Sequence, residues 1–153
     1  MEEKKERQLA KLVVYVFLER NGKHGKEILL GRRKNAFGEG HYSLPAGHIE
    51  KGETVLECAK RELFEETGIK VKSDEFEFVG VRLIEPYMLN GVMADLYVAF
   101  AVKPKNWEGE PKLMEPEKNE VWEWHSIDKL PEPMFPPVPM LIELIKKSVN
   151  FID

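Results

Sequence analysis

The stretch that decides the fold of this chain reads Gly47-His-Ile-Glu-Lys-Gly-Glu and, after seven residues, Arg61-Glu-Leu-Phe-Glu-Glu-Thr-Gly-Ile69. Its carboxylates at Glu62, Glu65 and Glu66 are spaced i, i+3, i+4, which places them on one face of a helix. Like charges at that spacing repel unless a cation lies between them. A divalent hard cation takes oxygen ligands and commonly accompanies phosphate substrates. The stretch therefore predicts chemistry on a metal-bound diphosphate.

The flanks of this stretch predict where the helix begins and ends. Thr54 is a good N-cap, and Glu57 three residues later completes a capping box. The helix is expected over residues 55–67, and Gly68 is the expected left-handed stop. Residues 47–53 then form a loop that leads into the helix.

The remaining pattern predicts a mixed sheet flanked by helices, which is an α/β fold. Runs rich in β-branched and aromatic residues indicate strands at 11–18, 27–31, 75–84, 92–102 and 121–125. The polar segment 20–26 is expected to join the first two of these strands as a hairpin. A long polar loop is expected at 104–118, a short helical turn at 126–130 and an amphipathic helix at 140–149.

Length and composition limit the classes of protein to consider. The 153 residues fit one domain, and 42% hydrophobic with 33% charged residues is ordinary for a soluble protein. A net charge of −4 with mixed signs argues against general nucleic-acid binding. No apolar run approaches the roughly 20 residues that cross a membrane, and we interpret the apolar N-terminal run as a strand rather than a signal peptide. A single cysteine, Cys58, fits a reducing compartment, so a cytoplasmic location is expected.

The quoted stretch resembles the signature of the Nudix hydrolases at every fixed position. The matching residues are Gly47, Glu53, Arg61, Glu62, Leu63, Glu65, Glu66, Gly68 and Ile69. The resemblance implies a single Nudix domain over 1–153, an α/β/α sandwich with its signature box at 47–69. It also implies that a metal-activated water splits a nucleoside diphosphate linked to another group.

Roles within the box follow from the same resemblance. Glu62, Glu65, Glu66 and the Gly47 carbonyl are the expected ligands of Mg²⁺ or Mn²⁺. Arg61 and Glu53 would hold the loop against the helix, and a catalytic role for Glu53 stays open. The box does not decide which glutamate accepts the proton of the attacking water.

The loop after residue 104 is similar to the MutT-type branch of this family. In that branch a glutamate between the last strands completes the metal site or acts as the base. The candidates here are Glu115, Glu117 and Glu120, and the Trp-Glu-Gly-Glu-Pro spacing favours Glu115. This likeness implies hydrolysis of nucleoside triphosphates, such as dGTP or its oxidised form, to a monophosphate and pyrophosphate, as in sanitation of the nucleotide pool.

Two departures from the MutT pattern bear on the substrate. The segment Phe135-Pro-Pro-Val-Pro139 has proline where enzymes that select oxidised guanine carry an asparagine. The Pro-Ala-Gly that ends at Gly47, with Pro86 seventeen residues after the box, resembles ADP-ribose hydrolases. An ADP-ribose or nucleotide-sugar diphosphatase is therefore the alternative. A non-catalytic nucleotide sensor is more remote, since such modules lose box glutamates.

Residues outside the box complete the expected site. Arg32 and Arg33 follow the second strand and are candidates to bind phosphate oxygens through their planar guanidinium groups. Phe135 is a candidate stacking surface for a base, as are other aromatic residues including Tyr42, Tyr87 and Trp124. The expected partner is a small nucleotide, with no membrane partner. A homodimer is suggested by family likeness alone.

Overall fold

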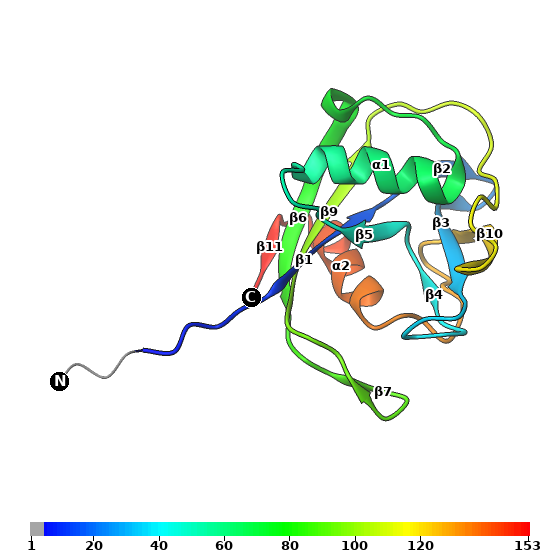
Figure 1. The fold of residues 1–153 in the computed structure, drawn as a ribbon. Coiled ribbons are helices and arrows are strands. Elements are labelled where there is room, and N and C mark those ends of the chain that lie inside the picture. The colour runs from blue at the N-terminus through cyan, green and yellow to red at the C-terminus, as the bar shows by residue number, and fades with distance from the viewer. Residues whose placement is uncertain (1–4) are drawn as a thin grey trace.

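The computed structural model describes residues 5–153 as two main β-sheets and one two-stranded hairpin, with a helix on either side of the largest sheet (Figure 1). The strands are β1 Lys11–Val16, β2 Glu19–Gly22, β3 Gly25–Arg33, β4 Tyr42–Ser43, β5 Ala46–His48, β6 Phe76–Ile84, β7 Met88–Leu89, β8 Val92–Met93, β9 Tyr97–Pro104, β10 Asn119–Ser126 and β11 Phe151–Ile152. The helices are α1 Val55–Thr67 and α2 Pro137–Lys146, with a 3-10 turn at Ser73–Glu75.

The larger sheet is mixed and has the order β11-β6-β9-β1-β5. Strand β1 runs parallel to β9 and antiparallel to β5, while β6 and β9 form an antiparallel pair. The expected strand at 92–102 is divided, because β8 belongs to a small β7–β8 hairpin that projects from the body (Figure 1). The pairing of β1 with β5 places Gly47 in the edge strand of the sheet, opposite Val14.

The second sheet corrects one expectation from the sequence. We expected residues 11–18 and 27–31 to form a hairpin, but β3 pairs with β2, β4 and β10. The expected turn segment itself contains β2, and the tight turn lies between Gly22 and Gly25. Strand β1 is not available to β3, since β5 and β9 occupy its two edges.

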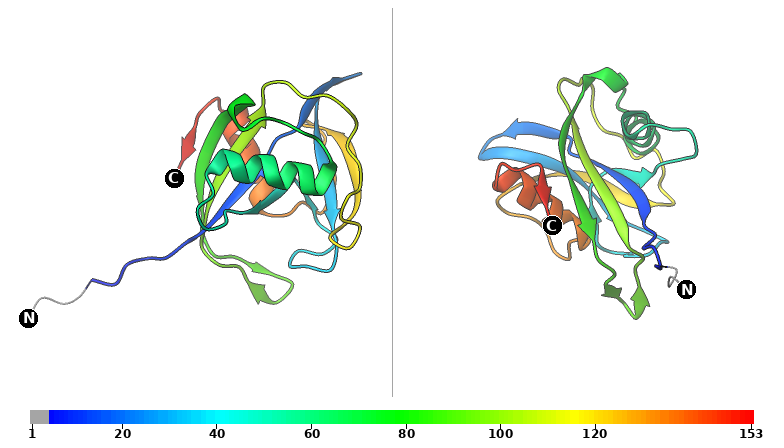
Figure 2. Two further views of the ribbon diagram at one scale, coloured as in Figure 1. Left: turned by 45° about the horizontal axis from the view of Figure 1, so that its top comes forward. Right: turned by 90° about the vertical axis from the view of Figure 1, so that its left-hand side faces the viewer.

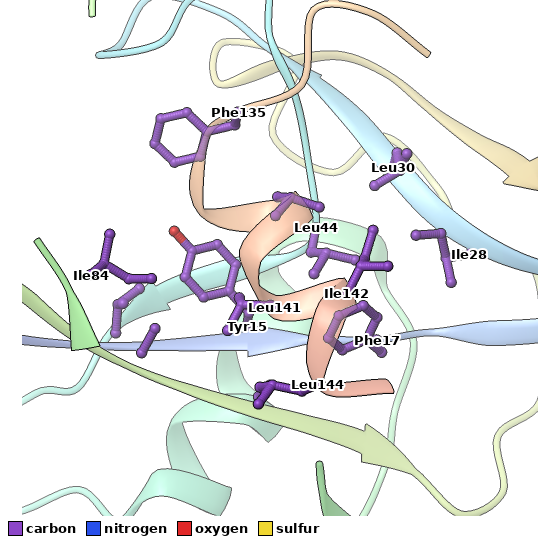
Figure 3. Close-up of a cluster of buried hydrophobic side chains, with 14 of the residues drawn as sticks. Tyr15, Phe17, Ile28, Leu30, Leu44, Ile84, Phe135, Leu141, Ile142 and Leu144 are labelled. Atoms are coloured by element: carbon purple, nitrogen blue, oxygen red, sulfur yellow. The ribbon is translucent and has the colours of Figure 1, made fainter. Parts of the chain in front are cut away.

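The alternation of β1 side chains builds two apolar layers. Val14 and Val16 face α1, whereas Tyr15 and Phe17 lie in the cluster that α2 covers (Figure 3). Two further views show the helices on opposite sides of the sheet (Figure 2). The fold is therefore the expected α/β/α sandwich with a mixed sheet. No helix in residues 5–153 has the length and apolar character needed to cross a membrane.

Helix α1 is formed as its sequence predicts. The Thr54 side chain accepts a hydrogen bond from the Glu57 backbone, and the Glu57 carboxylate accepts one from Thr54 N in return, at 3.2 and 2.8 Å. Gly68 ends the helix at φ 75°, where a residue with a side chain is strained. These local signals fix the length of α1 and hence the positions of its glutamates.

The C-terminal part of the chain differs from expectation in two places. Helix α2 begins at Pro137, earlier than the expected residue 140, because proline at the first helical position has its φ already set and needs no N–H partner. It ends at Lys146 rather than 149. Residues 126–130 form a hydrogen-bonded turn rather than a helical one.

Candidate active site

Glu66 is the most buried carboxylate on α1. Its side chain accepts a hydrogen bond from the backbone N–H of Ala46, at 2.9 Å, which ties the helix to the turn before Gly47. Burial, followed by the charge of Glu62, raises the pKa of Glu66 well above its ordinary value of 4.5. A buried carboxylate of this kind favours a cation beside it.

Gly47 lies directly against Glu62 of the helix. A Cβ at this position would overlap the carboxyl group of Glu62, which would have to move. The absence of a side chain at residue 47 therefore lets the backbone of β5 and the Glu62 carboxyl group lie in contact.

Arg61 holds the loop and the helix together. Its guanidinium donates to both carboxylate oxygens of Glu53 at 2.7 and 3.0 Å and to Glu62 at 2.6 Å. It also reaches Glu65 at 3.3 Å and the His48 carbonyl at 3.2 Å. The hydrogen bonds from Arg61 lower the pKa of Glu53 to about 2. Glu53 is thus an ionised anchor of the loop, with both oxygens engaged by one partner.

The loop after β9 brings Glu115 to the same helix. The backbone N–H of Lys112 bonds to the Thr67 carbonyl, and the Trp122 indole N–H bonds to the Glu66 carbonyl at 3.0 Å. One carboxylate oxygen of Glu115 pairs with Lys118 at 3.0 Å, and the other is buried without a hydrogen-bond partner among the described residues. The charge of Glu115 also contributes to the raised pKa of Glu66.

The other two candidates in this loop lie elsewhere. Glu117 is exposed, and Glu120 pairs with Arg32 at 3.3 Å. Of the three glutamates, the structure brings only Glu115 to the buried carboxylates of α1.

The carboxylates of this site have the oxygen atoms that a divalent hard cation binds, but their side chains are not gathered around one point in the described residues. Within residues 5–153, no three acidic, histidine or cysteine side chains are gathered as metal ligands. Glu62 and Glu65 are directed to Arg61, and Glu115 to Lys118. These two basic side chains neutralise the carboxylates from which a cation would take its oxygens. The unpartnered Glu115 oxygen and the buried Glu66 are the observations that favour a cation here.

A cleft of about 640 Å³ joins two of these carboxylates, Glu62 and Glu66, to an aromatic region, whereas Glu65 and Glu115 are not among its lining residues. Gly47, Glu62 and Glu66 line it at one end. The aromatic residues that line it are Tyr15, Phe37, Tyr87, Tyr97 and Phe135. A cleft with acidic and aromatic ends suits a ligand that carries both phosphates and a flat ring.

The two arginine candidates are separated by the structure. Arg33 lines the cleft, with its guanidinium 4.2 Å from the Phe135 ring centroid and its Nε bonded to the Phe37 carbonyl at 2.8 Å. Arg32 points to Gly40 and Glu120 and is not among the lining residues. Phe135 lies at the aromatic end, edge-on to Phe37.

Sequence reasoning missed several lining residues. Tyr15, His48, Tyr97 and Asn119 all face the cleft, and His48 stacks on Tyr97 with an interplanar angle of 13°. The sequence signal that could have identified Tyr15 was a tyrosine within a strand expected to be buried, because a tyrosine hydroxyl needs a polar partner. Tyr42 packs edge-on against His125 and does not line the cleft. Cys58 is a packed residue as expected, buried against the Gly47 and His48 carbonyls, and burial raises its pKa to about 12.

Comparison with known proteins agrees with this geometry. A model of the NUDIX domain matches residues 9–143. The chain belongs to the Nudix family. An oxidized purine nucleoside triphosphate hydrolase from Danio rerio is 31% identical over 129 residues, which cover 80% of this chain and 70% of that protein. The NAD-capped RNA hydrolase NudC of Actinobacillus succinogenes is 32% identical over 84% of this chain, which spans only 46% of that protein.

Solved structures resemble this Nudix chain over nearly its whole length. A MutT NUDIX hydrolase from Burkholderia pseudomallei gives a TM-score of 0.74 at 26% identity, covering 90% of this chain and 99% of that one. The NUDIX domain of Shewanella oneidensis NrtR gives the same TM-score at 18% identity, over 93% and 90%, and is similar in fold. The protein is a MutT-like Nudix hydrolase, of a family that acts on small nucleotides and generally uses divalent cations.

Proposed function

We propose that this Nudix hydrolase converts nucleoside triphosphates to monophosphates and pyrophosphate with the help of Mg²⁺ or Mn²⁺. The observation that carries the proposal is that one and the same cleft is lined by the buried Glu66 at one end and by Phe135 at the other. Phosphates need neutralisation, and a base needs a flat apolar surface. The substrate named for the Danio rerio relative supports the same choice.

In this proposal Glu62, Glu65, Glu66 and the Gly47 carbonyl hold the cation, and Glu115 completes the site. When bound, the cation would neutralise charge on the phosphate oxygens and favour ionisation of the attacking water. Arg33 lines the cleft over the Phe135 ring, so it would need to leave that ring to bind a phosphate oxygen near Glu66, just as Arg32 would need to leave Glu120. The water oxygen forms the new bond to phosphorus, the bridging oxygen leaves with pyrophosphate, and a carboxylate takes the proton.

The identity of that carboxylate distinguishes the candidates. Glu53 already shares both oxygens with Arg61, which favours a structural role over that of a base. Glu115 has a buried oxygen with no hydrogen-bond partner among the described residues, so it is the better candidate to accept the proton.

The position of Pro139 bears on whether this enzyme selects nucleotides with oxidised guanine. This residue is exposed and does not line the cleft, so the place matched to a base-reading asparagine faces away from the aromatic end. We therefore propose nucleoside triphosphates as the class and leave the preference among bases to experiment.

The second candidate is a diphosphatase for ADP-ribose or another diphosphate that joins two sugars. The similarity to NudC favours it, because that relative is named for hydrolysis of an NAD cap. The same cleft would bind the diphosphate at Glu66 and one base at Phe135. A non-catalytic sensor has less support, since every box glutamate is present.

A substrate screen separates these candidates. The purified enzyme is incubated with each dNTP, an oxidised dGTP, ADP-ribose and a nucleotide sugar, with Mg²⁺, Mn²⁺ or a chelator. We expect pyrophosphate and a monophosphate from triphosphates, and no product with the chelator. Turnover of ADP-ribose with inert triphosphates would overturn the first choice. The Glu66→Gln variant, run in parallel, excludes a contaminating phosphatase.

We also propose a domain organisation, a cellular location and an oligomeric state for this protein. The chain is a single Nudix domain over 1–153, and its one cysteine supports a cytoplasmic location. A homodimer would be detected by sedimentation velocity at micromolar concentration.

A further inference from the structure

The ring of Tyr15 is buried, but its hydroxyl opens onto the cleft and is not used by the fold. Tyr15 is the last residue but one of β1, with only 4% of its surface exposed, and its ring packs in the cluster that α2 covers. No hydrogen bond joins its hydroxyl to another of residues 5–153, although Tyr15 lines the cleft. Figure 3 shows that the hydroxyl points to the side where Phe135 lies.

A phenylalanine would fill this position in the core equally well. Phe17, two residues further along the chain and just after the end of β1, is fully buried in the same cluster. The Tyr15 hydroxyl has no hydrogen-bond partner among the described residues, and it is not one of their fully buried unpartnered atoms, so it opens onto the cleft. A hydroxyl at a position where a phenylalanine would pack as well is suited to bind something that enters the cleft.

The neighbours of this hydroxyl are already engaged or belong to the aromatic end. Burial raises the pKa of Tyr15, and the charges of Tyr87, Arg33 and Tyr97 act on it as well. The Tyr97 hydroxyl lies 3.2 Å from His48 Nε2, and Arg33 Nε donates to the Phe37 carbonyl. The Tyr15 hydroxyl is thus a free donor and acceptor beside aromatic rings, in the part of the cleft where a base would lie.

We propose that the Tyr15 hydroxyl determines base specificity by forming a hydrogen bond with an exocyclic oxygen or amino group of the nucleobase. The inference rests on the proposed function, in which phosphates lie at Glu66 and the base at Phe135. A site with a buried polar group discriminates strongly against an analogue without the matching atom, because that group is then left unpaired. Tyr15 would act on binding and selectivity and leave the hydrolytic step to the carboxylates.

The test is Tyr15→Phe, which removes one oxygen and keeps the ring. Steady-state kinetics are measured with the four dNTPs and with the triphosphate of unsubstituted purine deoxyriboside. For the dNTP that the wild type prefers, we expect kcat/KM to fall about tenfold, mainly through KM, as loss of one hydrogen bond predicts. For the triphosphate of unsubstituted purine deoxyriboside we expect no change in kcat/KM. The selectivity ratio, which is kcat/KM for the preferred dNTP divided by kcat/KM for this analogue, therefore decreases.

Thermal unfolding of the same variant gives an independent readout. Without nucleotide, Tyr15→Phe should be as stable as the wild type or more stable, because no internal hydrogen bond is lost. Tyr42→Phe is the matched control, since it removes a tyrosine oxygen outside the cleft. We expect it to leave the selectivity ratio unchanged.

Unchanged selectivity in Tyr15→Phe would overturn the inference, and so would a clear loss of stability, which would reveal an internal partner. If the wild type hydrolyses ADP-ribose and no triphosphate, the proposed function has failed. The comparison of ADP-ribose with its unsubstituted-purine analogue then still decides the role of Tyr15.

Discussion

Glu66 is a residue whose buried carboxylate lowers the stability of the fold, although we propose that the same carboxylate is needed for activity. It is buried against the sheet, and within the described residues its carboxylate accepts one hydrogen bond, from the Ala46 backbone. Its raised pKa means that the folded protein loses stability as pH rises above the unfolded pKa, because burial disfavours the ionised form. That cost is recovered only when a cation or another positive group lies beside the carboxylate.

We expect Glu66→Gln to lower turnover by at least about 10²-fold, as loss of a charged group that stabilises the transition state does. The same change should raise the midpoint of thermal unfolding in chelator at pH 7, because glutamine keeps the acceptor for Ala46 N and has no charge to bury. Kinetics and calorimetry on one preparation measure both effects.

Glu57→Gln is the control, since it makes the same change on α1 and keeps the acceptor of the capping box. Its turnover and its midpoint of thermal unfolding should both stay near those of the wild type. Wild-type turnover in Glu66→Gln would refute the role of this carboxylate.

Helix α1 could be read from the sequence because its signals are local, whereas the expected loop at 47–53 begins as strand β5, which contains Gly47 and His48. The capping box, the Gly68 stop and the spacing of the glutamates act within a few residues, and all were confirmed. Strand pairing was harder, because the partners of β1 are β5 and β9, the second of which lies more than 80 residues away. The role of Tyr15 depends on these distant contacts, so its strand pattern alone indicated only a core residue.

The same limit applies to the loop between β9 and β10. Its composition predicted a long irregular segment, and the spacing favoured Glu115. The contacts that hold it, from Lys112 to Thr67 and from Trp122 to Glu66, join the loop to a helix some 45 to 56 residues earlier. No local pattern encodes such contacts.

The pairing of Arg61 with Glu53 makes the attachment of the loop to α1 depend on pH. The folded pKa of Glu53 is about 2, below the unfolded value of about 4.3. A lowered pKa adds stability above the unfolded value, and this stability is lost as pH falls toward 2. We expect Glu53→Gln to cost about 2 kcal/mol of unfolding free energy at pH 6, the range for hydrogen bonds to charged groups.

Urea unfolding of the wild type and Glu53→Gln between pH 6 and pH 2.5, in chelator, measures this difference. It should be constant above about pH 5 and shrink below that, because protonated glutamate resembles glutamine. Glu117→Gln, at an exposed side chain, should differ little from the wild type at any pH. A Glu53 difference that does not depend on pH would contradict the ion pair.

At the scale of the whole molecule, the two apolar layers share strand β1 and should unfold together. All three tryptophans, Trp107, Trp122 and Trp124, pack against the layer under α1, whereas the layer under α2 has none. Tryptophan fluorescence therefore reports on one layer, and far-ultraviolet circular dichroism reports on both.

We expect the two signals to give the same urea midpoint, as a single cooperative domain requires. The reason is that loss of either layer exposes one face of β1 and removes support from the other. Separate midpoints would show that the layers unfold independently and would argue against one domain over 1–153. Refolding from urea with recovered activity is the check on reversibility.

The burial of Cys58 gives this enzyme a built-in reporter of motion at the active site. Its thiol lies under the Gly47 and His48 carbonyls with no exposed surface, and its high pKa keeps it protonated. A thiol reagent can reach it only when the packing of α1 opens, and separation of β5 from α1 is one such opening, so the alkylation rate reports these motions. Cations or nucleotides that hold β5 against α1 should then slow labelling of Cys58, and their binding can be timed without any probe added to the protein.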